Sequence, residues 1–279
     1  MTPATVLEAR AYDPFCAVSV LGAIHRLADA SHSKDLSDLV SAGKWKAELL
    51  ATLGKVAPPR YANFIGRYRD DPDFEVRRAV ASALGLIDNE AIAVPVLVHV
   101  LARNDRRESF FVQWDAGQSL IAVAKRKSPD GVRRRVVELF QEPYGMTVAI
   151  AARALAATGD ARGFAKLREL TGHADPDVRR EAVLALGELR DRGGADLVTR
   201  RLSDDNVAVR GAAVYALARI KGAAVIPELR TAVQGALAYE RDRRRDAGEK
   251  PEALERLGIG VFDLRETLQE AITETQSKG

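Results

Sequence analysis

Apolar residues recur along this chain at the spacing of an α-helix. The clearest apolar stripe consists of Val178, Ala182, Ala185, Leu186 and Leu189. With 3.6 residues per helical turn, these positions share one face of a helix. Asp175 precedes this helix as a candidate N-cap, and Pro176 fits its first turn. The pattern therefore predicts an amphipathic helix that begins at about residue 176.

The same segment is repeated along the chain. Similar copies start at Asp71 and Asp205, and weaker ones share an apolar leucine near the end of the helix. These anchor positions are Leu21, Leu53, Leu84, Leu120, Leu155, Leu186 and Leu217. Successive anchors are 31 to 36 residues apart, which leaves room for two helices in each repeat.

A partner helix is visible before several copies. The apolar pattern predicts such first helices at Glu90–Ala102, Ala161–Thr171 and Gly194–Leu202. One helical pair cannot bury its apolar face alone, so neighbouring pairs must stack. We therefore expect an all-α fold, an α-solenoid of about six to seven helical pairs within a single domain.

Three regions are expected within this domain. Residues 1–56 are degenerate N-terminal repeats, residues 57–222 are regular repeats, and residues 223–279 form a C-terminal cap. In the cap, Val261–Thr275 is predicted to be an amphipathic capping helix, because terminal repeats must close the core against water. The alternative is that this helix detaches to bind a partner.

The repeated pattern Asp-Pro-Asp-x-Val-Arg-x-x-Ala-x-x-Ala-Leu-Gly resembles the HEAT-repeat family over roughly residues 14–235. It is most similar to the short bacterial form, which also occurs in phycobilisome-lyase-like proteins, and this suggests a bacterial source. The resemblance implies a ladder of polar contacts between adjacent repeats. Its members would be Arg77, Arg179 and Arg210 with Asp73, Asp177 and Asp205. The motif is specific for the fold and says little about function.

The charge balance argues against a nucleic-acid protein. The 42 basic residues are nearly matched by 39 acidic residues, which gives a net charge of +3. The basic runs at residues 103–107, 133–135 and 241–245 are interpreted as solvated helix ends and loops. The chain shows no leader pattern and no membrane-spanning segment, and Cys16 is its single cysteine. We therefore expect a cytoplasmic protein that does not enter a membrane.

The repeat is irregular on both sides of the copy anchored at Leu120. Extra residues occur at 103–111 and at 125–131, and insertions in a solenoid form surface loops. Phe110 and Phe111 lie in the first insertion. They either extend the core of a longer helix or belong to a contact patch.

The residues that depart from the repeat provide the candidate binding groove. Trp114 occupies the position that Arg180 holds in the clear copy, on the side of the second helix away from the apolar stripe. Second helices line the concave side of such rods, and mixtures of aromatic residues and arginine are typical of binding hot spots. The candidate groove residues are Arg78, Trp114, Asp115, Gln118, Arg153, Arg180, Glu181 and Tyr215. Trp114 and Tyr215 could instead cover a helix crossing.

Enzymatic alternatives find little support in the sequence. Deoxyhypusine hydroxylases resemble this repeat pattern but hold two irons with His-Glu pairs, and this chain has none. Its histidines are scattered and lack the spacing of metal ligands: His25, His32, His99 and His173. We therefore predict no catalytic residue, no metal and no cofactor.

Two further relatives remain as alternatives. HEAT-like alkylpurine DNA glycosylases use tryptophans and a carboxylate in a basic groove, but here Gln118 stands where the acid is needed after Trp114. The phycobilisome-lyase-like resemblance implies a cofactor-loading or chaperone role. The favoured prediction is a non-enzymatic scaffold or adaptor that binds a protein partner, and nucleic acid is the weaker alternative.

Overall fold

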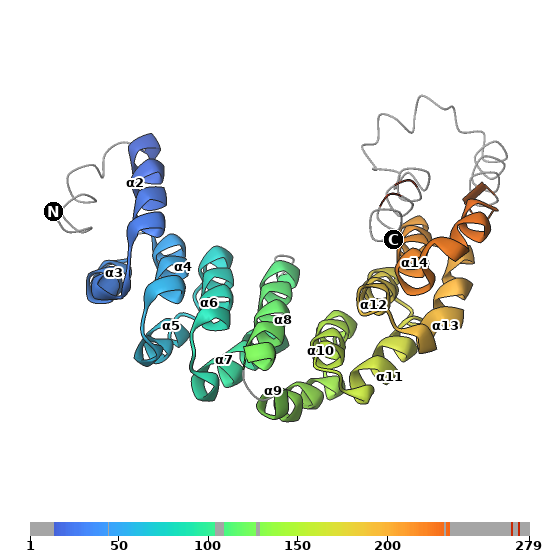
Figure 1. Ribbon diagram of the computed structural model, residues 1–279. Helices are drawn as coiled ribbons and strands as arrows, with labels where there is room; N and C mark the ends of the chain where they lie inside the picture. Colours follow the sequence, from blue (N-terminus) through green and yellow to red (C-terminus); the bar gives the residue numbers. More distant parts are fainter. Residues whose placement is uncertain are drawn as a thin grey trace. The chain divides into compact units, whose positions relative to one another are not determined.

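The computed structural model describes residues 14–43, 45–103, 109–126, 129–231 and 233–234, together with residues 269 and 273. Throughout these ranges the chain forms helices joined by turns, with no strand. The helices follow one another in pairs, so the predicted all-α solenoid of HEAT-like pairs is confirmed (Figure 1). The predicted capping helix Val261–Thr275 and most of the 223–279 cap lie outside the described residues.

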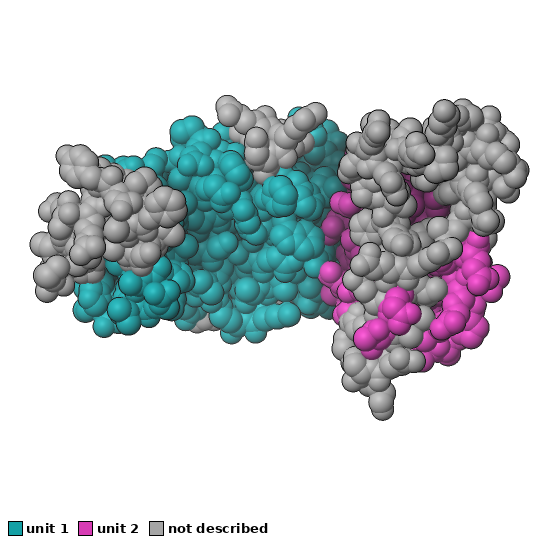
Figure 2. Space-filling view, turned by 90° about the horizontal axis from the view of Figure 1, so that it is seen from above, with its two compact units in different colours: residues 1–160 teal, residues 161–279 magenta. Residues whose placement is uncertain are grey.

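The chain divides into two compact units, residues 1–160 and residues 161–279 (Figure 2). The helices of unit 1 are α2 (Pro14–Leu27), α3 (Ser33–Ser41), α4 (Lys46–Val56), α5 (Ala62–Gly66), α6 (Phe74–Leu86), α7 (Glu90–Ala102), α8 (Ser109–Arg126), α9 (Pro129–Val136) and α10 (Gly145–Ala157). The second helices α2, α4, α6, α8 and α10 pack side by side in one row (Figure 1). The first helices α3, α5, α7 and α9 form the other row, so unit 1 has a second-helix face and a first-helix face.

Unit 2 repeats the same arrangement. Its helices are α11 (Ala161–Leu170), α12 (Pro176–Glu188), α13 (Ala195–Arg200) and α14 (Val207–Lys221). The second helices α12 and α14 pack against each other, with α11 against α12 and α13 against α14. Short 3-10 turns flank α13, which is therefore shorter than the predicted helix Gly194–Leu202.

The anchor leucines form the centre of the core in each unit. Leu53, Leu84, Leu120 and Leu155 are fully buried in unit 1, as are Leu186 and Leu217 in unit 2, while Leu21 is 8% exposed. Burying a leucine side chain stabilises a fold by about 2 kcal/mol, so this repeated position contributes to every layer of the stack. The register read from the sequence is therefore the register of the core.

The starts of the second helices follow from local capping. Asp175 accepts a hydrogen bond from the backbone N–H of Asp177 at 2.8 Å, and Pro176 is the first residue of α12, as predicted. Asp73 and Asn206 cap α6 and α14 in the same way. These caps satisfy backbone N–H groups that have no partner inside a helix.

The polar ladder between repeats is only partly as predicted. Arg179 bonds the carboxylates of Asp204 and Asp205 in the next repeat, at 2.7 to 3.0 Å. Arg179 also donates to the carbonyl oxygens of His173 and Ala174 in its own turn, and Arg77 donates in the same way to those of Asp71 and Pro72. Asp73 is occupied as a helix cap. The ladder role expected for Asp73 is therefore wrong, because its side chain satisfies a local backbone donor instead.

The glycine that ends the repeat motif allows neighbouring second helices to approach closely. A Cβ atom on Gly187 would lie 2.5 Å from the Cα of Ala216 on α14. In unit 1, Gly54 meets the backbone of Ala83 and Gly85 meets Ser119 in the same way. Only a residue without a side chain fits these crossings, which explains why the motif ends in glycine.

Candidate functional site

The eight predicted groove residues are divided between the two units. Unit 1 contains Arg78 on α6, Trp114, Asp115 and Gln118 on α8, and Arg153 on α10. Unit 2 contains Arg180 and Glu181 on α12 and Tyr215 on α14. Each set is therefore a separate candidate within the second-helix row of its unit.

The first turns of α8 carry three aromatic rings in succession. Phe110 contacts Phe111 edge to face with ring centroids 5.6 Å apart, and it contacts Trp114 at 6.1 Å. Phe110 packs against the core, whereas Phe111 is 55% exposed. Phe110 thus extends the core as one of the two predictions held, while Phe111 lies on the surface, where a contact patch stays a prediction.

Trp114 is held by an arginine of the neighbouring second helix. The guanidinium carbon of Arg153 lies 4.0 Å from the centre of the Trp114 ring, which is close contact for a cation–π interaction. Trp114 is partly exposed, but Arg153 is only 9% exposed. Arg153 therefore fixes the orientation of the ring and offers little surface of its own to a partner.

A second arginine connects α6 to α8. Arg78 Nε donates to Asp115 Oδ2 at 2.7 Å, and Glu75 lies 3.5 Å from another nitrogen of the same guanidinium. The hydrogen bond to Asp115 raises the pKa of the Arg78 guanidinium above its ordinary value. Arg78 also lies over the ring of Phe111, 5.7 Å from its centre. Two carboxylates thus balance the positive charge beside the exposed ring.

Ring and cation–π contacts join five residues into one cluster, the aromatic patch: Phe110, Phe111, Trp114, Arg78 and Arg153. Gln118 lies one turn further along α8 and is partly exposed. Phe111 is the main exposed apolar residue of this patch, although its position in the repeat does not by itself predict an exposed binding residue. The signal in the sequence is the pair of adjacent aromatics at the end of an insertion.

The residues of unit 2 are arranged differently. Arg180 is partly exposed and lies 3.9 Å from Asp177, while Glu181 is 95% buried. The Tyr215 hydroxyl accepts a hydrogen bond from Arg219 at 3.0 Å, and the Arg219 guanidinium lies 5.4 Å from the ring centre. Tyr215 is partly exposed. This set therefore offers a smaller aromatic surface than the patch of unit 1.

Two further features of the described residues bear on other functions. No cluster of three or more histidine, cysteine, aspartate or glutamate side chains with the geometry of a metal site is present in those ranges. Among the same residues, no helix is long and apolar enough to cross a membrane.

A family model for HEAT repeats matches residues 41–121 and 165–248. The chain belongs to the HEAT-repeat family. A comparison with curated proteins found no match. The matched HEAT-repeat segments cover α4 and α6 with most of α8 in unit 1, and the repeats of α12 and α14 in unit 2.

Several solved structures are similar to this HEAT-repeat chain. An engineered protein is 21% identical, with a TM-score of 0.43 and coverage of 78% of this chain and 97% of its own. The complex of CpcE and CpcF of phycocyanin lyase from Nostoc is 16% identical, with a TM-score of 0.43 and coverage of 78% and 87%. Human deoxyhypusine hydroxylase is 17% identical, with a TM-score of 0.35 and coverage of 88% and 98%.

Proposed function

We propose that this HEAT-repeat chain is a non-catalytic scaffold that binds a segment of a protein partner through the second-helix face of unit 1. The observation that carries the proposal is the exposure of Phe111 within the aromatic patch, where 55% of the residue is open to solvent. Helical-repeat folds present extended surfaces of this kind, which bind long ligands without a deep pocket.

The construction of the patch supports a binding role. Phe110 supports the rings from below, Arg153 holds Trp114, and Arg78 lies over Phe111. A ring that is already ordered loses little conformational entropy when a partner covers it, so rigid aromatic surface gives more net binding energy.

The charges near the patch favour protein over nucleic acid. Nucleic-acid sites gain most of their affinity from arginine and lysine side chains that neutralise phosphates. The Arg78 guanidinium is bonded to Asp115 and lies near Glu75, so a phosphate would have to displace carboxylates. Arg153 is buried under Trp114. The two arginines of the patch thus order its rings and are poorly placed to bind a phosphate backbone.

Affinity capture from native cells tests this function. The wild-type chain is compared with Phe111→Ser and with Leu27→Ser, which removes an exposed apolar residue on α2, two helices away from the patch. We expect a specific protein to be captured by the wild type and by Leu27→Ser and lost with Phe111→Ser. Equal capture by all three chains would show that the aromatic patch does not bind the partner.

Retention on a DNA column tests the alternative that the chain binds nucleic acid. We expect little retention at low salt and no steep salt dependence, because Arg78 is bonded to Asp115 and Arg153 is stacked on Trp114. Strong retention that collapses between low and moderate salt, and that Phe111→Ser abolishes, would place the chain with the DNA-binding members of its fold.

A further inference from the structure

The three arginines at residues 133–135 have different environments. Arg133 Nε donates to Thr158 Oγ1 at 3.1 Å, a second nitrogen of the guanidinium donates to the Thr158 carbonyl, and Asp160 lies 3.9 Å away. Arg134 and Arg135 are exposed instead. Arg133 is therefore structural, whereas the other two are available for contacts with other molecules.

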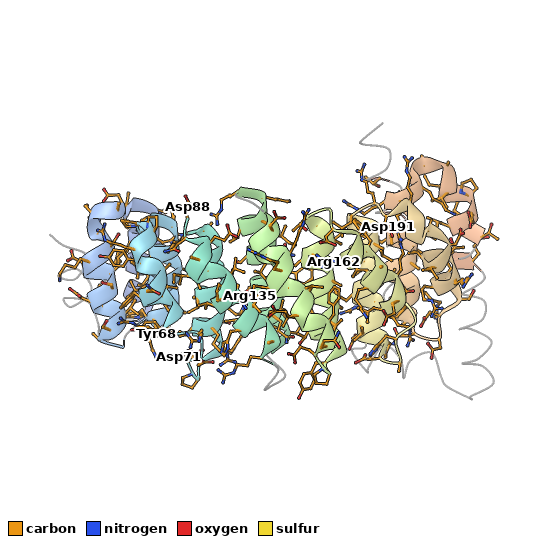
Figure 3. The ribbon with its side chains drawn as sticks, turned by 90° about the horizontal axis from the view of Figure 1, so that it is seen from below. Tyr68, Asp71, Asp88, Arg135, Arg162 and Asp191 are labelled. Atoms are coloured by element: carbon orange, nitrogen blue, oxygen red, sulfur yellow. The ribbon has the colours of Figure 1, made fainter. Side chains whose placement is uncertain are left out.

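Arg134 and Arg135 line a cleft between α7 and α9 on the first-helix face of unit 1. Figure 3 views the molecule from this side and labels Arg135. The apolar part of the cleft comes from Ala91, Val94 and Pro95 of α7, of which Ala91 and Pro95 are exposed. The cleft thus places two guanidinium groups beside a small apolar surface.

Two carboxylates, Glu90 and Glu138, also line the cleft. Glu138 lies 3.9 Å from Arg135, and both are more than half exposed, which makes a weak ion pair. Glu90 Oε1 is directed against the backbone of Gly131 in the first turns of α9. Within the described part of the chain, Arg134 has neither an ion pair nor a hydrogen bond from its side chain. Its full hydrogen-bonding capacity is therefore open to a ligand.

An unpaired guanidinium is best satisfied by a planar oxyanion that accepts two parallel hydrogen bonds, as a carboxylate does. The form of the cleft favours a protein segment over a small acid. The cleft is open to solvent, whereas small-molecule sites enclose most of the ligand surface. A protein segment can extend beyond the cleft and gain contact area there.

We infer that this cleft binds an acidic segment of a protein partner, with a carboxylate on Arg134 and an adjacent apolar side chain against Ala91 and Pro95. This surface lies on the first-helix face and is independent of the aromatic patch. It gives unit 1 a second docking site, which recognises charge where the patch recognises apolar surface.

Fluorescence anisotropy with a short labelled peptide of glutamate, leucine and alanine tests the inference on the full chain. The variants are Arg134→Glu, Ala91→Gln and, as a matched control, Arg67→Glu, which reverses an exposed arginine after α5. We expect Arg134→Glu to weaken binding at least about tenfold, because a like charge then faces the ligand carboxylate. Arg67→Glu should leave the affinity unchanged, and all chains should keep the wild-type circular dichroism and Tm.

Ala91→Gln separates a docked segment from diffuse attraction. It leaves every charge in place but covers the apolar surface, so we expect weaker binding of the same peptide. A peptide with glutamine in place of glutamate should bind at least about tenfold more weakly than the glutamate peptide.

Several results would overturn the inference. These are equal binding of the glutamate and glutamine peptides, equal loss with Arg67→Glu and Arg134→Glu, or no effect of Ala91→Gln. Displacement of the peptide by inorganic phosphate beyond the effect of chloride at the same ionic strength would show a simple anion site. Absence of any peptide binding would show that the cleft has no such role.

Discussion

The guanidinium carbon of Arg153 lies 4.0 Å from the centre of the Trp114 ring, so a cation–π contact joins the neighbouring second helices α8 and α10. The pair joins the copy of the repeat that is flanked by insertions to the next copy along the chain. It therefore serves two purposes, since it stabilises the stack and holds the aromatic patch in one orientation.

Replacing Arg153 with methionine keeps most of the side-chain volume and removes the charge. We expect the free energy of unfolding to fall by about 1 to 2 kcal/mol, because the stacked arginine is largely removed from water. Urea unfolding measures this change, and Arg67→Met at an exposed site is the control, with a change below about 0.5 kcal/mol. Equal effects of the two substitutions would mean that the stack contributes nothing beyond a surface arginine.

The glycine that ends the repeat motif gives a second prediction. Alanine normally stabilises a helix relative to glycine by about 1 kcal/mol. At Gly187 the added Cβ would lie 2.5 Å from the Ala216 backbone, so Gly187→Ala should instead destabilise the chain by about 1 to 3 kcal/mol. Thermal and urea unfolding measure the sign of the change.

Gly172→Ala is the matched control in the same unit. A Cβ at Gly172 would meet its nearest neighbour, the carbonyl oxygen of Glu169, at 3.6 Å, an ordinary contact distance. The expected change is within about 0.5 kcal/mol. A stabilising effect of Gly187→Ala would refute the close helix approach.

The buried carboxyl group of Asp204 makes the stability of unit 2 depend on pH. Burial raises the pKa of its carboxyl group, but the hydrogen bonds from Arg179 and the Asn206 backbone outweigh burial, so the pKa lies below its ordinary value of 3.8. A carboxyl group with a lowered pKa in the folded state stabilises the fold fully above 3.8. This contribution is lost as the pH falls below that value and the folded carboxylate takes up a proton.

Asp204→Asn should therefore lower the free energy of unfolding near neutral pH by about 3 kcal/mol, because Arg179 loses its buried partner. The same variant should show a shallower loss of stability on acidification than the wild type. Urea unfolding between about pH 6 and pH 2 measures both effects. Parallel curves for wild type and variant would contradict the assignment.

Asp70 provides a contrasting case on the surface of unit 1. Hydrogen bonds from His99 and Arg103, at 2.9 and 2.7 Å, lower the pKa of its carboxyl group. The side chain is 48% exposed, however, so solvent screens these interactions. We expect Asp70→Asn to change the free energy of unfolding by less than about 1 kcal/mol, as measured in urea. A loss as large as that of Asp204→Asn would show that the exposure of an ion pair does not determine its contribution to the free energy of unfolding.

The helices were predictable where local signals determine them. The predicted helix Glu90–Ala102 is α7, and α12 begins at Pro176 after the Asp175 cap. An apolar period and a capping side chain act within a few residues, so sequence alone contains this information. The seven anchors gave the register for the same reason, since each leucine marks the buried centre of its helix.

The side-chain pairings of the site were not predictable to the same degree. The repeat register placed Trp114 and Arg153 on the same side of their helices, but it could not show that Arg153 is buried beneath the ring. That depends on how long side chains cross between helices 35 residues apart in the register, from Leu120 to Leu155. The polar ladder was also only partly predictable. The buried partner of Arg179 is Asp204, which lies one residue before the repeat motif that begins at Asp205.

Titration calorimetry of the captured partner with the purified chain tests the central claim most directly. The account predicts that Phe111→Ser weakens binding at least about tenfold, as expected for an aromatic hot spot, while the Tm of the free chain is unchanged. Leu27→Ser should bind as the wild type does. Equal affinity of wild type and Phe111→Ser, with both chains folded, would contradict the claim that the aromatic patch is the binding surface.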